Sequence, residues 1–424
     1  MTHKNISAGK RIVLGVTGSI ACYKAAELAR YFMKRGCDVR VVMTESATKF
    51  IAPLTFETLT HNPVAVSFWT ETQPGAIGHI ELADWADAVV VAPATADCVA
   101  KMAFGMGESS VLAVVLATKA PVIVAPAMNV NMYEHPQTQE NLQALQARGV
   151  AIVEPEAGDL ACGWRGKGRL ASAREIYLQT RRAMGPQDLL GKRVLISAGP
   201  TREAIDPVRY ISNRSSGKMG IALANEAYIR GASVTMVHGP LPGGRPSVSQ
   251  DVDCVAVTSA AEMSEAIQTR VFDAPRYNQP DIVIMAAAVA DYRPAHPAAE
   301  KIKKTTSDDS LSLHANEDIL ASLGRRRGEA ASPLLVGFAV ETGEPHKVIS
   351  EARHKLSRKN VDIVVGNLAQ DAFDRDTNQV WIVNRRGTLK HVSTCKKITV
   401  AREILNQVVE DVEPDTREPE QHLH

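Results

Sequence analysis

The chain has 424 residues, of which 45% are hydrophobic and 22% carry a charge. A chain of this size and ordinary composition can form about two or three packed domains of ~150 residues each. Its 48 lysines and arginines nearly balance its 47 acidic residues, which gives a formal net charge of +1. Because no global field attracts polyanions, we expect neither nucleic acid nor a membrane surface as a partner.

The six cysteines lie far apart in the sequence, and no two of them form a C-x-x-C pair. This spacing argues against a disulfide framework and against a structural zinc site. No stretch of 18 apolar residues is present, and the first ten residues lack the apolar segment of a signal peptide. We therefore expect reduced thiols and a cytoplasmic location.

The first half of the sequence alternates β-branched runs with amphipathic segments. Strands are predicted at 11–16, 39–44, 88–92 and 122–125, and helices at 23–35, 137–148 and 173–184. Residues 185–191 then interrupt the pattern with glycine and proline, which terminate helices. We expect residues 1–190 to form the first domain.

The second half continues in the same way. Strands are predicted at 193–197, 233–238, 282–286, 334–338, 361–365 and 380–384, with a last helix at 401–409. We expect residues 191–409 to form the second domain. From residue 410 onward the sequence carries six acidic residues and one arginine without apolar spacing, so that 410–424 is predicted to be a disordered acidic tail.

Three phrases of the first half recur in the second half in the same order. KRIVLGVTG at 10–18 matches KRVLISAGP at 192–200, RGCDVRVVMT at 35–44 matches RGASVTMVHG at 230–239, and DAVVVAPATAD at 87–97 matches DIVIMAAAVAD at 281–291. Three matches in one order indicate an internal repeat. Strand–turn–helix alternation is typical of α/β folds, and we predict two Rossmann-like domains, each a doubly wound parallel sheet.

The first predicted strand leads through Thr17, Gly18 and Ser19 into a helix. Backbone N–H groups and hydroxyls at a helix N-terminus can bind phosphate. The G-x-G-x-x-G pattern is missing, and Thr44 ends the second strand where a dinucleotide site has an acidic residue, so a mononucleotide is favoured. The alternative is a tight turn with a purely structural role.

Three further segments of the first half are unusual for a plain scaffold: His79, the segment PAMNVNM at 126–132, and Cys162 within the glycine-rich residues 158–168. A single histidine or cysteine is by default structural. Asn129, however, directly follows a strand, where ligands bind in doubly wound sheets. A glycine-rich stretch with one thiol also suits a flap that closes over a substrate.

On these residues the first half resembles the flavin-dependent cysteine decarboxylases, and within them phosphopantothenoylcysteine decarboxylase. It departs from many relatives in one respect, because Tyr133 stands where they carry tryptophan. The resemblance implies that FMN is the cofactor and that His79 assists oxidation of the substrate. It also implies that Asn129 holds the carboxylate and that Cys162 donates a proton. We assign the FMN contacts to Gly18, Ser19, Thr44 and Met128.

Two segments of the second half predict binding of an anion or a nucleotide. Residues 211–220, ISNRSSGKMG, begin a helix with serines and Lys218, but Met219 excludes a P-loop, and a serine-capped helix with a surface lysine is the alternative. Small residues at 286–290 precede Asp291 at a strand end, where a base or ribose can approach the backbone. The basic run at 301–304 is by itself only a solvated loop or a weak phosphate attractor.

These segments resemble the phosphopantothenate–cysteine ligases, and the two halves together resemble the bifunctional coenzyme A biosynthesis family. The resemblance implies 4'-phosphopantothenate, cysteine and CTP as substrates, with Mg²⁺ arriving on CTP. It implies that Asn213 stabilises an acyl cytidylate and that Lys301 serves its conversion. It places CTP contacts at Asp291, Lys301, Phe338, Lys355 and Lys359. It also implies a homo-oligomer with trimeric first halves and dimeric second halves, such as a dodecamer.

The sequence leaves two alternatives to this function. An NAD(P)-dependent reductase with two Rossmann-like domains would need the dinucleotide fingerprint and the acidic ribose ligand that are missing. A flavin-binding regulatory subunit without activity would not need His79, Asn129 and Cys162 together.

Overall fold

The computed structural model describes residues 9–67, 78–159, 163–303, 310–341, 344–368 and 375–412. Contacts divide the chain into two compact units, Met1–Gly185 and Pro186–His424. Within the described residues, no helix is both long and apolar enough to cross a membrane.

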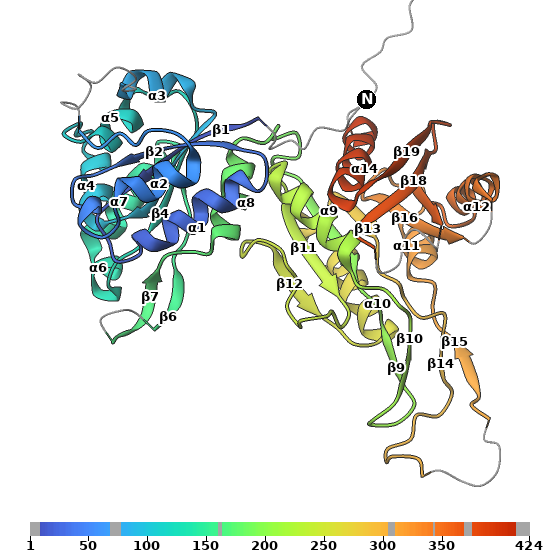
Figure 1. Cartoon of the computed structure of the whole chain (residues 1–424). Helices are drawn as coiled ribbons and strands as arrows, with labels where there is room; N and C mark the ends of the chain where they lie inside the picture. The colour runs from blue at the N-terminus through green and yellow to red at the C-terminus, as the bar shows by residue number, and fades with distance from the viewer. Residues whose placement is uncertain are drawn as a thin grey trace, which may run out of the picture. The chain divides into compact units, whose positions relative to one another are not determined.

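Unit 1 is an α/β sandwich (Figure 1). Its strands are β1 (Arg11–Val16), β2 (Asp38–Met43), β3 (Ala88–Ala94), β4 (Val122–Pro126) and β5 (Ala151–Ile152). Its helices are α1 (Cys22–Met33), α2 (Pro53–Thr60), α3 (His79–Trp85), α4 (Ala96–Ala103), α5 (Ser110–Ala117), α6 (Val130–Glu134), α7 (Pro136–Ala147) and α8 (Ala173–Ala183), with a 3₁₀ turn at Ala47–Lys49. The five strands form one parallel sheet in the order β2-β1-β3-β4-β5.

Helices cover both faces of this sheet because side chains of a strand point alternately to opposite faces. On one face, Val13 and Val91 pack in a core with side chains of α3, α4, α5 and α7. On the other face, α1 packs against β1, β2 and β3 and against α8, where the rings of Phe32 and Tyr177 lie 5.7 Å apart. Near-continuous apolar strands are expected for a parallel sheet that is buried on both faces.

A hairpin of β6 (Glu156–Asp159) and β7 (Arg165–Arg169) extends away from the sheet of unit 1 (Figure 1). It is attached to the loop after β4, where the N–H of Met128 donates to the carbonyl of Gly168 at 3.0 Å. Gly168 has a φ of 152°, and a Cβ there would collide with the carbonyl oxygen of Met128. Glycine is therefore needed where the hairpin crosses this loop.

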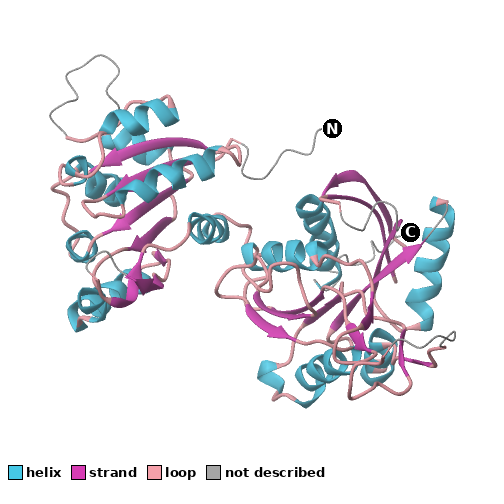
Figure 2. Cartoon of the chain, turned by 60° about the horizontal axis from the view of Figure 1, so that its bottom comes forward, coloured by secondary structure: helices cyan, strands magenta, loops and turns pink. Residues whose placement is uncertain are grey.

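Unit 2 contains a larger sheet with two small hairpins (Figures 1 and 2). Its strands are β8 (Arg193–Ala198), β9 (Arg202–Ala204), β10 (Tyr210–Ser212), β11 (Ser233–His238), β12 (Asp253–Ala256), β13 (Ile282–Met285), β14 (Tyr292–Pro294), β15 (Leu313–Ala315), β16 (Leu334–Glu341), β17 (Ile363–Leu368), β18 (Thr377–Asn384) and β19 (Leu389–Lys396). Its helices are α9 (Lys218–Ile229), α10 (Ala260–Gln268), α11 (Ile319–Arg327), α12 (Pro345–Arg358) and α14 (Lys397–Val412), with a π-helical turn at Thr269–Asp273 and a 3₁₀ turn at Arg276–Asn278.

The eight-stranded sheet of unit 2 has the order β12-β11-β8-β13-β16-β17-β18-β19. Strands β12 to β17 are parallel, whereas β18 and β19 run antiparallel to their neighbours. One face packs against α9 and α14 and the other against α10, α11 and α12, as Figure 2 shows by helices on both sides of the strands. The doubly wound α/β class is confirmed for both units. The second sheet differs from the predicted all-parallel sheet at one edge, where β18 and β19 are antiparallel.

The repeat seen in the sequence is also a repeat of structure. The matching strands lie in the same order, β2-β1-β3 in unit 1 and β11-β8-β13 in unit 2. Their register agrees, because Arg11 pairs with Asp38 as Arg193 pairs with Ser233. Each central strand also begins with a clamp, in which its first N–H donates to an aspartate before the neighbouring strand: Arg11 to Asp87 at 2.8 Å and Arg193 to Asp281 at 2.7 Å.

Some boundaries differ from those predicted. Residues 186–190 belong to unit 2 by contacts rather than to the first domain, because Leu189 lies in the core of unit 2 and Asp188 pairs with Arg230. The last helix is longer than predicted and ends at Val412, so the predicted tail loses its first three residues. The helix continues because Val412 still packs on the core and Asp411 accepts a hydrogen bond from Asn384 at 3.0 Å. Residues 413–424 of the predicted tail lie outside the described residues.

Candidate active sites

The carboxyl edge of the unit 1 sheet has a switch point between β1 and β3, because β2 and β3 lie on opposite sides of β1. Ligands of doubly wound sheets, FMN in the 2-1-3-4-5 order among them, bind at such a point. The hydroxyl of Thr17 connects the two strands there: it donates to the carbonyl of Pro93 at 2.7 Å and accepts from the N–H of Thr95 at 3.1 Å. Thr17 therefore shapes the turn.

Gly18 and Ser19 form the turn between β1 and α1. Ser19 Oγ accepts from the N–H of Ala21 at 3.2 Å, which orders the turn before the helix begins. A Cβ built on Gly18 would lie 2.5 Å from Ser46 Oγ. The loops after β1 and β2 thus approach each other too closely for any side chain at Gly18.

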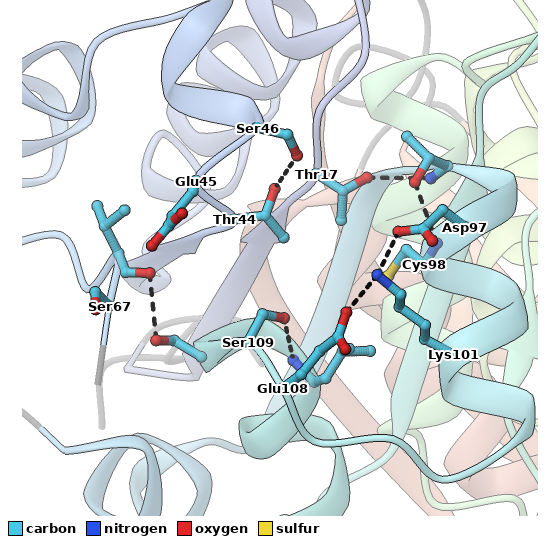
Figure 3. A pocket seen from close by; sticks show the side chains of 14 residues that line it. Thr17, Thr44, Glu45, Ser46, Ser67, Asp97, Cys98, Lys101, Glu108 and Ser109 are labelled. Carbon is cyan, nitrogen blue, oxygen red and sulfur yellow. Dashed lines mark hydrogen bonds and ion pairs between the residues drawn. The ribbon is translucent and has the colours of Figure 1, made fainter. Parts of the chain in front are cut away.

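A cavity of about 290 Å³ opens beside this turn (Figure 3). Half of its lining side chains carry hydroxyls, and we call it the hydroxyl cavity. It is lined by Thr17, Thr44, Ser46, Ser67, Thr95, Ser109 and Ser110, by the charged Glu45, Asp97, Lys101 and Glu108, and by Val66, Cys98 and Leu112. Two of these hydroxyls cap helices, since Thr95 accepts from Cys98 N–H and Ser109 from Leu112 N–H. Two helix N-termini therefore face a polar cavity, which favours an anionic ligand.

Lys101 is the cation of the hydroxyl cavity. Its Nζ lies 3.0 Å from Asp97 Oδ2 and forms a second ion pair with Glu108, as Figure 3 shows. Hydrogen bonds to Glu108 and Asp97 raise the pKa of Lys101, so it stays charged at neutral pH. Because two carboxylates share this charge, the hydroxyls and the first-turn N–H groups are the main donors left for an anion.

A second cavity, of about 520 Å³, lies between the turn and the β6–β7 hairpin, and we call it the hairpin cavity. It brings together Ser19, Met128 and Asn129 with Gly168 and Arg169 of the hairpin; Ile20, Ala21, Tyr23, Lys24, Ala127, Asp159 and Leu170 complete its lining. Asn129 caps α6, and its Oδ1 accepts from the N–H of Asn131 at 2.8 Å. Lys24 and Arg169 are the two cations in its lining. Burial, and then the charge of Arg169, lower the pKa of Lys24, while Glu156 and Glu27 act in the opposite direction.

The predicted residues of unit 1 therefore divide. Ser19, Met128 and Asn129 line the hairpin cavity, Thr44 lines the hydroxyl cavity, and Gly18 lies in the turn between them. His79 is half-buried at the first position of α3 and lines neither cavity. Cys162 lies outside the described residues, between the strands of the β6–β7 hairpin.

Tyr133, the departure from the family pattern, is a core residue. It lies on the buried side of α6, and its hydroxyl donates to Glu154 Oε2 at 2.8 Å. Burial, followed by this hydrogen bond, raises the pKa of the phenol. Tyr133 lines neither cavity.

In unit 2 the equivalent switch point lies between β8 and β13. The side-chain amide of Asn213 donates to the carbonyl of Ala288, beyond the end of β13, and its Oδ1 accepts from the N–H of Ser215 at 3.2 Å. Asn213 thereby connects the segment before α9 with the small residues 286–290. The sequence analysis treated these two segments separately, and the structure shows that they are in contact.

The N-terminus of α9 follows directly. Gly217 has a φ of 72°, and Lys218 is the first helical residue. A Cβ at Gly220 would collide with the side chain of Ala198, so the first turn of the helix lies tightly on the end of β8. Lys218 Nζ lies 2.6 Å from Asp376 Oδ1.

Four of the predicted CTP residues lie on a connected set of contacts. The carbonyl of Asp291 accepts from the N–H of Asn316 at 2.8 Å. Two residues further, Asp318 caps α11 and pairs with Lys359 at 2.6 Å. Lys355 Nζ donates to the carbonyl of Phe338 at 3.1 Å. Burial, and then the charge of Lys359, lower the pKa of Lys355, as expected for two ammonium groups held near each other.

Lys301 is exposed, but the loop that carries it is anchored. The N–H of Ile302 donates to Asp206 Oδ2 at 3.1 Å, and its carbonyl accepts from Arg209 Nη2 at 2.9 Å. Asp206 is buried, and the guanidinium of Arg209 holds its pKa well below the usual range. The Asp206–Arg209 pair therefore holds the backbone at Ile302, within the segment that begins at Lys301 and that we call the lysine loop. The Lys301 side chain remains in solvent.

Sequence reasoning missed several residues at these sites. Thr95, Ser109 and Asp318 carry a readable signal, since each is a Ser, Thr or Asp just before a helix. Ser46, Ser67, Asp206 and Asp376 carry none, because only the folded chain brings each of them beside residues that are distant in sequence.

Two family models match the chain. One is described as "Flavoprotein" and matches residues 1–184; the other is "DNA/pantothenate metabolism flavoprotein C-terminal domain" and matches residues 189–412. The fold and the matches together define a two-part flavoprotein of pantothenate metabolism.

Curated relatives match nearly the whole chain. The "Coenzyme A biosynthesis bifunctional protein CoaBC" of Vibrio cholerae serotype O1 is 45% identical over 385 residues, covering 90% of this chain and 93% of the relative. The protein of the same name from Escherichia coli strain K12 is 43% identical over 409 residues, covering 95% and 97%. The chain belongs to this family of bifunctional coenzyme A biosynthesis enzymes, as the sequence predicted. A two-domain NAD(P)-dependent reductase is thereby excluded.

Solved structures match each half separately. The C-terminal domain of a coenzyme A biosynthesis bifunctional protein CoaBC is 38% identical, with a TM-score of 0.43, and covers 53% of this chain and 97% of its own. "The FMN binding protein AtHal3" is 31% identical, with a TM-score of 0.36, and covers 41% and 95%.

Proposed function

We propose that the second half joins cysteine to the carboxylate of 4'-phosphopantothenate with the use of CTP. The first half then decarboxylates the product to 4'-phosphopantetheine with FMN. The observation that carries this proposal is that each half has a predicted residue at the switch point of its doubly wound sheet, Ser19 in unit 1 and Asn213 in unit 2. The order of reactions is the reverse of the order of domains.

The two cavities of unit 1 fit FMN. The hydroxyl cavity suits the phosphate and the ribityl hydroxyls, because it offers hydroxyls and helix N-termini. The hairpin cavity, with Ile20, Met128 and Leu170, suits an apolar ring. Thr44, Gly18, Ser19 and Met128 are the proposed contacts. FMN, when bound, supplies the oxidation of the substrate thiol and the later reduction.

The residues of unit 1 have separate proposed roles. Oxidation of the thiol to a thioaldehyde gives the carbanion left by CO₂ loss an acceptor. Asn129 holds the departing carboxylate by hydrogen bonding, supported by its place in the hairpin cavity beside Lys24 and Arg169. Cys162 protonates the carbon that has lost CO₂, and His79 assists the oxidative step. Both assignments rest on the family pattern.

In unit 2 the proposed intermediate is an acyl cytidylate, because an unactivated carboxylate is a poor electrophile. Asp291 and Phe338 contact the cytidine, while Lys355 and Lys359 contact the phosphates of CTP, which carries Mg²⁺. Asn213 stabilises the acyl cytidylate at the β8–β13 switch point. Lys301, on its anchored loop, contacts CTP and assists the attack of cysteine on the acyl cytidylate.

We also propose a cytoplasmic homo-oligomer in which trimers of the first half and dimers of the second half generate a closed assembly such as a dodecamer. The family resemblance supports the oligomer. The wide spacing of the six cysteines supports the cytoplasmic location. Light scattering of the purified protein at micromolar concentration tests it, and a monomer would contradict it.

The proposed decarboxylase is tested by cofactor release and by two variants. Acid extraction should yield FMN; recovery of FAD or NAD would refute the assignment. Cys162→Ser should lose CO₂ and then stall, because a hydroxyl is a much weaker acid than a thiol, whereas His79→Asn should block the earlier oxidation. Normal formation of 4'-phosphopantetheine by Cys162→Ser would show that another group donates the proton.

The proposed ligase is tested by Lys301→Gln. We expect this variant to form acyl cytidylate and pyrophosphate from CTP and 4'-phosphopantothenate but to yield little amide when cysteine is added. Mass spectrometry of quenched reactions, first without and then with cysteine, separates the two steps. Normal amide formation would reduce Lys301 to a solvated loop residue.

A further inference from the structure

Unit 2 has a cavity of about 520 Å³ between α10 and α11, and we call it the α10–α11 cavity. Its lining includes Ser264 and Gln268 of α10, Arg293 of β14, and Asn316 and Glu317 of the segment before α11. None of these side chains has a role in the proposed function. The cavity is therefore a candidate for a ligand that has not yet been placed.

One end of the α10–α11 cavity adjoins the residues assigned to CTP and to the acyl cytidylate. Arg293 follows Asp291 by two residues, so that their Cα atoms lie at most about 7 Å apart. The N–H of Asn316 donates to the carbonyl of Asp291 at 2.8 Å, and its side-chain amide donates to the carbonyl of Ala290 at 2.8 Å. Ala290 belongs to the segment of small residues that Asn213 also contacts. A molecule beside Arg293 therefore lies next to the proposed intermediate.

Arg293 lines the cavity with a guanidinium that is oriented but not neutralised. Its Nη1 donates to Asn316 Oδ1 at 2.9 Å and to the carbonyl of Ala315 at 3.2 Å. Across the ranges that the structure describes, its Nε and Nη2 have no hydrogen-bond partner, and the residue forms no ion pair. Because one side of the planar group is held by the protein, the other N–H groups are set to donate to a carboxylate.

Glu317 brings the opposite charge to the same cavity. Its Oε2 accepts from Ser264 Oγ at 2.7 Å, and Gln268 Nε2 donates to Ser264 Oγ at 2.9 Å. Hydrogen bonds from Ser264 and Ser322 hold the pKa of Glu317 below its usual range, so that its carboxylate is charged at neutral pH. Among the described residues Glu317 forms no ion pair, with Arg293 or with any other cation. Two opposite charges thus line one cavity without neutralising each other.

Separated charges of this kind are complementary to a zwitterion, and among the substrates assigned to unit 2 only cysteine is one. We propose that the α10–α11 cavity binds the cysteine substrate, with its carboxylate on Arg293 and its ammonium on Glu317. This inference rests on the proposed ligase function of unit 2. Arg293 thereby selects a nucleophile that carries a carboxylate, which is the group that the first half later removes as CO₂.

Glu317 holds the ammonium and does not act as its base, because a carboxylate with a depressed pKa is a weak proton acceptor. The ammonium instead passes one proton to water. The amine then forms the bond to the acyl carbon while CMP leaves with the electrons of the broken C–O bond, and the new amide loses a second proton to water.

Comparison of cysteine with cysteamine, which lacks the carboxylate, tests the inference in the full-length protein. The rate of CMP release is measured at saturating CTP and 4'-phosphopantothenate. In Arg293→Gln, kcat/KM for cysteine should fall roughly tenfold through KM, the scale of one charge-assisted contact open to solvent, while kcat/KM for cysteamine stays as in wild type. Arg293→Lys should restore part of the loss, because it keeps the charge. Arg276→Gln, which removes an exposed arginine outside this cavity, is the matched control and should behave as wild type.

Unchanged use of cysteine by Arg293→Gln would overturn the inference, as would an equal loss with both nucleophiles in folded protein. Arg326 lines the cavity near the C-terminal end of α11, where it pairs with Asp273 at 2.5 Å. A loss confined to cysteine in Arg326→Gln instead of Arg293→Gln would also overturn it. Failure of wild-type protein to release CMP with either nucleophile would instead refute the proposed function of unit 2. Circular dichroism of each variant verifies the fold.

Discussion

Replacement of Gly18 by alanine tests whether the turn after β1 forms the flavin site. The φ of Gly18 is not in the left-handed region, so alanine brings no backbone strain there. The effect comes from contact alone. The new Cβ would lie 2.5 Å from Ser46 Oγ and 2.7 Å from Ser46 Cβ, roughly 1 Å inside the ~3.5 Å at which atoms attract.

The magnitude follows from the cost of overpacking. Inserting a methyl group into filled space costs about 1–3 kcal/mol. Relief requires Ser46 to move, which breaks its 3.0 Å hydrogen bond to Thr44 and reshapes the hydroxyl cavity. If the whole cost weakens FMN binding, the affinity falls roughly 5- to 140-fold, since 1.4 kcal/mol corresponds to a factor of ten.

Quenching of FMN fluorescence by apoprotein measures the affinity, and thermal unfolding followed by circular dichroism measures stability. A second substitution, Ser46→Gly, removes the two atoms nearest the new Cβ and should restore most of the affinity to Gly18→Ala. Ser46→Gly alone is the control for the lost hydroxyl. Wild-type affinity in Gly18→Ala, or a loss in folded protein that Ser46→Gly does not relieve, would refute the assignment of this turn.

Three further outcomes are expected. Asp206→Asn should release the lysine loop and reduce amide formation more than acyl cytidylate formation, as measured by mass spectrometry. Because the pKa of Asp206 is depressed, its anchoring is complete above the ordinary value near ~3.9 and is lost only as the pH falls through the folded value. Ligase rates between about pH 5 and 8 should therefore show no titration of this group; such a titration would contradict the anchor. Tyr133→Phe should lower the stability of the first half by about 1 kcal/mol without change in FMN affinity, because only its hydrogen bond to Glu154 is lost; denaturant titration decides, and weaker FMN binding would count against a purely structural role. Burial raises the pKa of Cys37 to about 11 and that of Cys98 to about 12, so iodoacetamide at about pH 8 should alkylate both only after unfolding; labelling of either in folded protein, detected by peptide mass spectrometry, would contradict their burial.

The sequence predicted the central strands well because they are buried on both faces and carry continuous apolar runs. β1 and β11 begin and end where predicted, at Arg11–Val16 and Ser233–His238. The repeated phrases also indicated which strands correspond. Local signals sufficed for these elements because their burial leaves little choice of residue.

Other elements have no local signal. The β6–β7 hairpin is made of glycine and charged residues, and it forms by packing on the loop of Met128 rather than by its own apolar pattern. β19 is mostly exposed and was not predicted. The hydroxyl cavity draws side chains from several loops that are distant in sequence, and no spacing rule connects Ser46 with Ser109. Motifs therefore pointed to the sites, whereas their boundaries needed the tertiary fold.

The paired clamps, Arg11 with Asp87 and Arg193 with Asp281, lie at the amino ends of the central strands. Gly18, Thr44 and Asn129, by contrast, lie beyond the carboxyl ends of β1, β2 and β4. Support of the scaffold and chemistry of the substrate are thus assigned to different residues, and a change in one set leaves the other intact. Loops at the carboxyl edge can accordingly be redesigned for new acyl or thiol substrates in either half, with the clamped strands kept as a common frame.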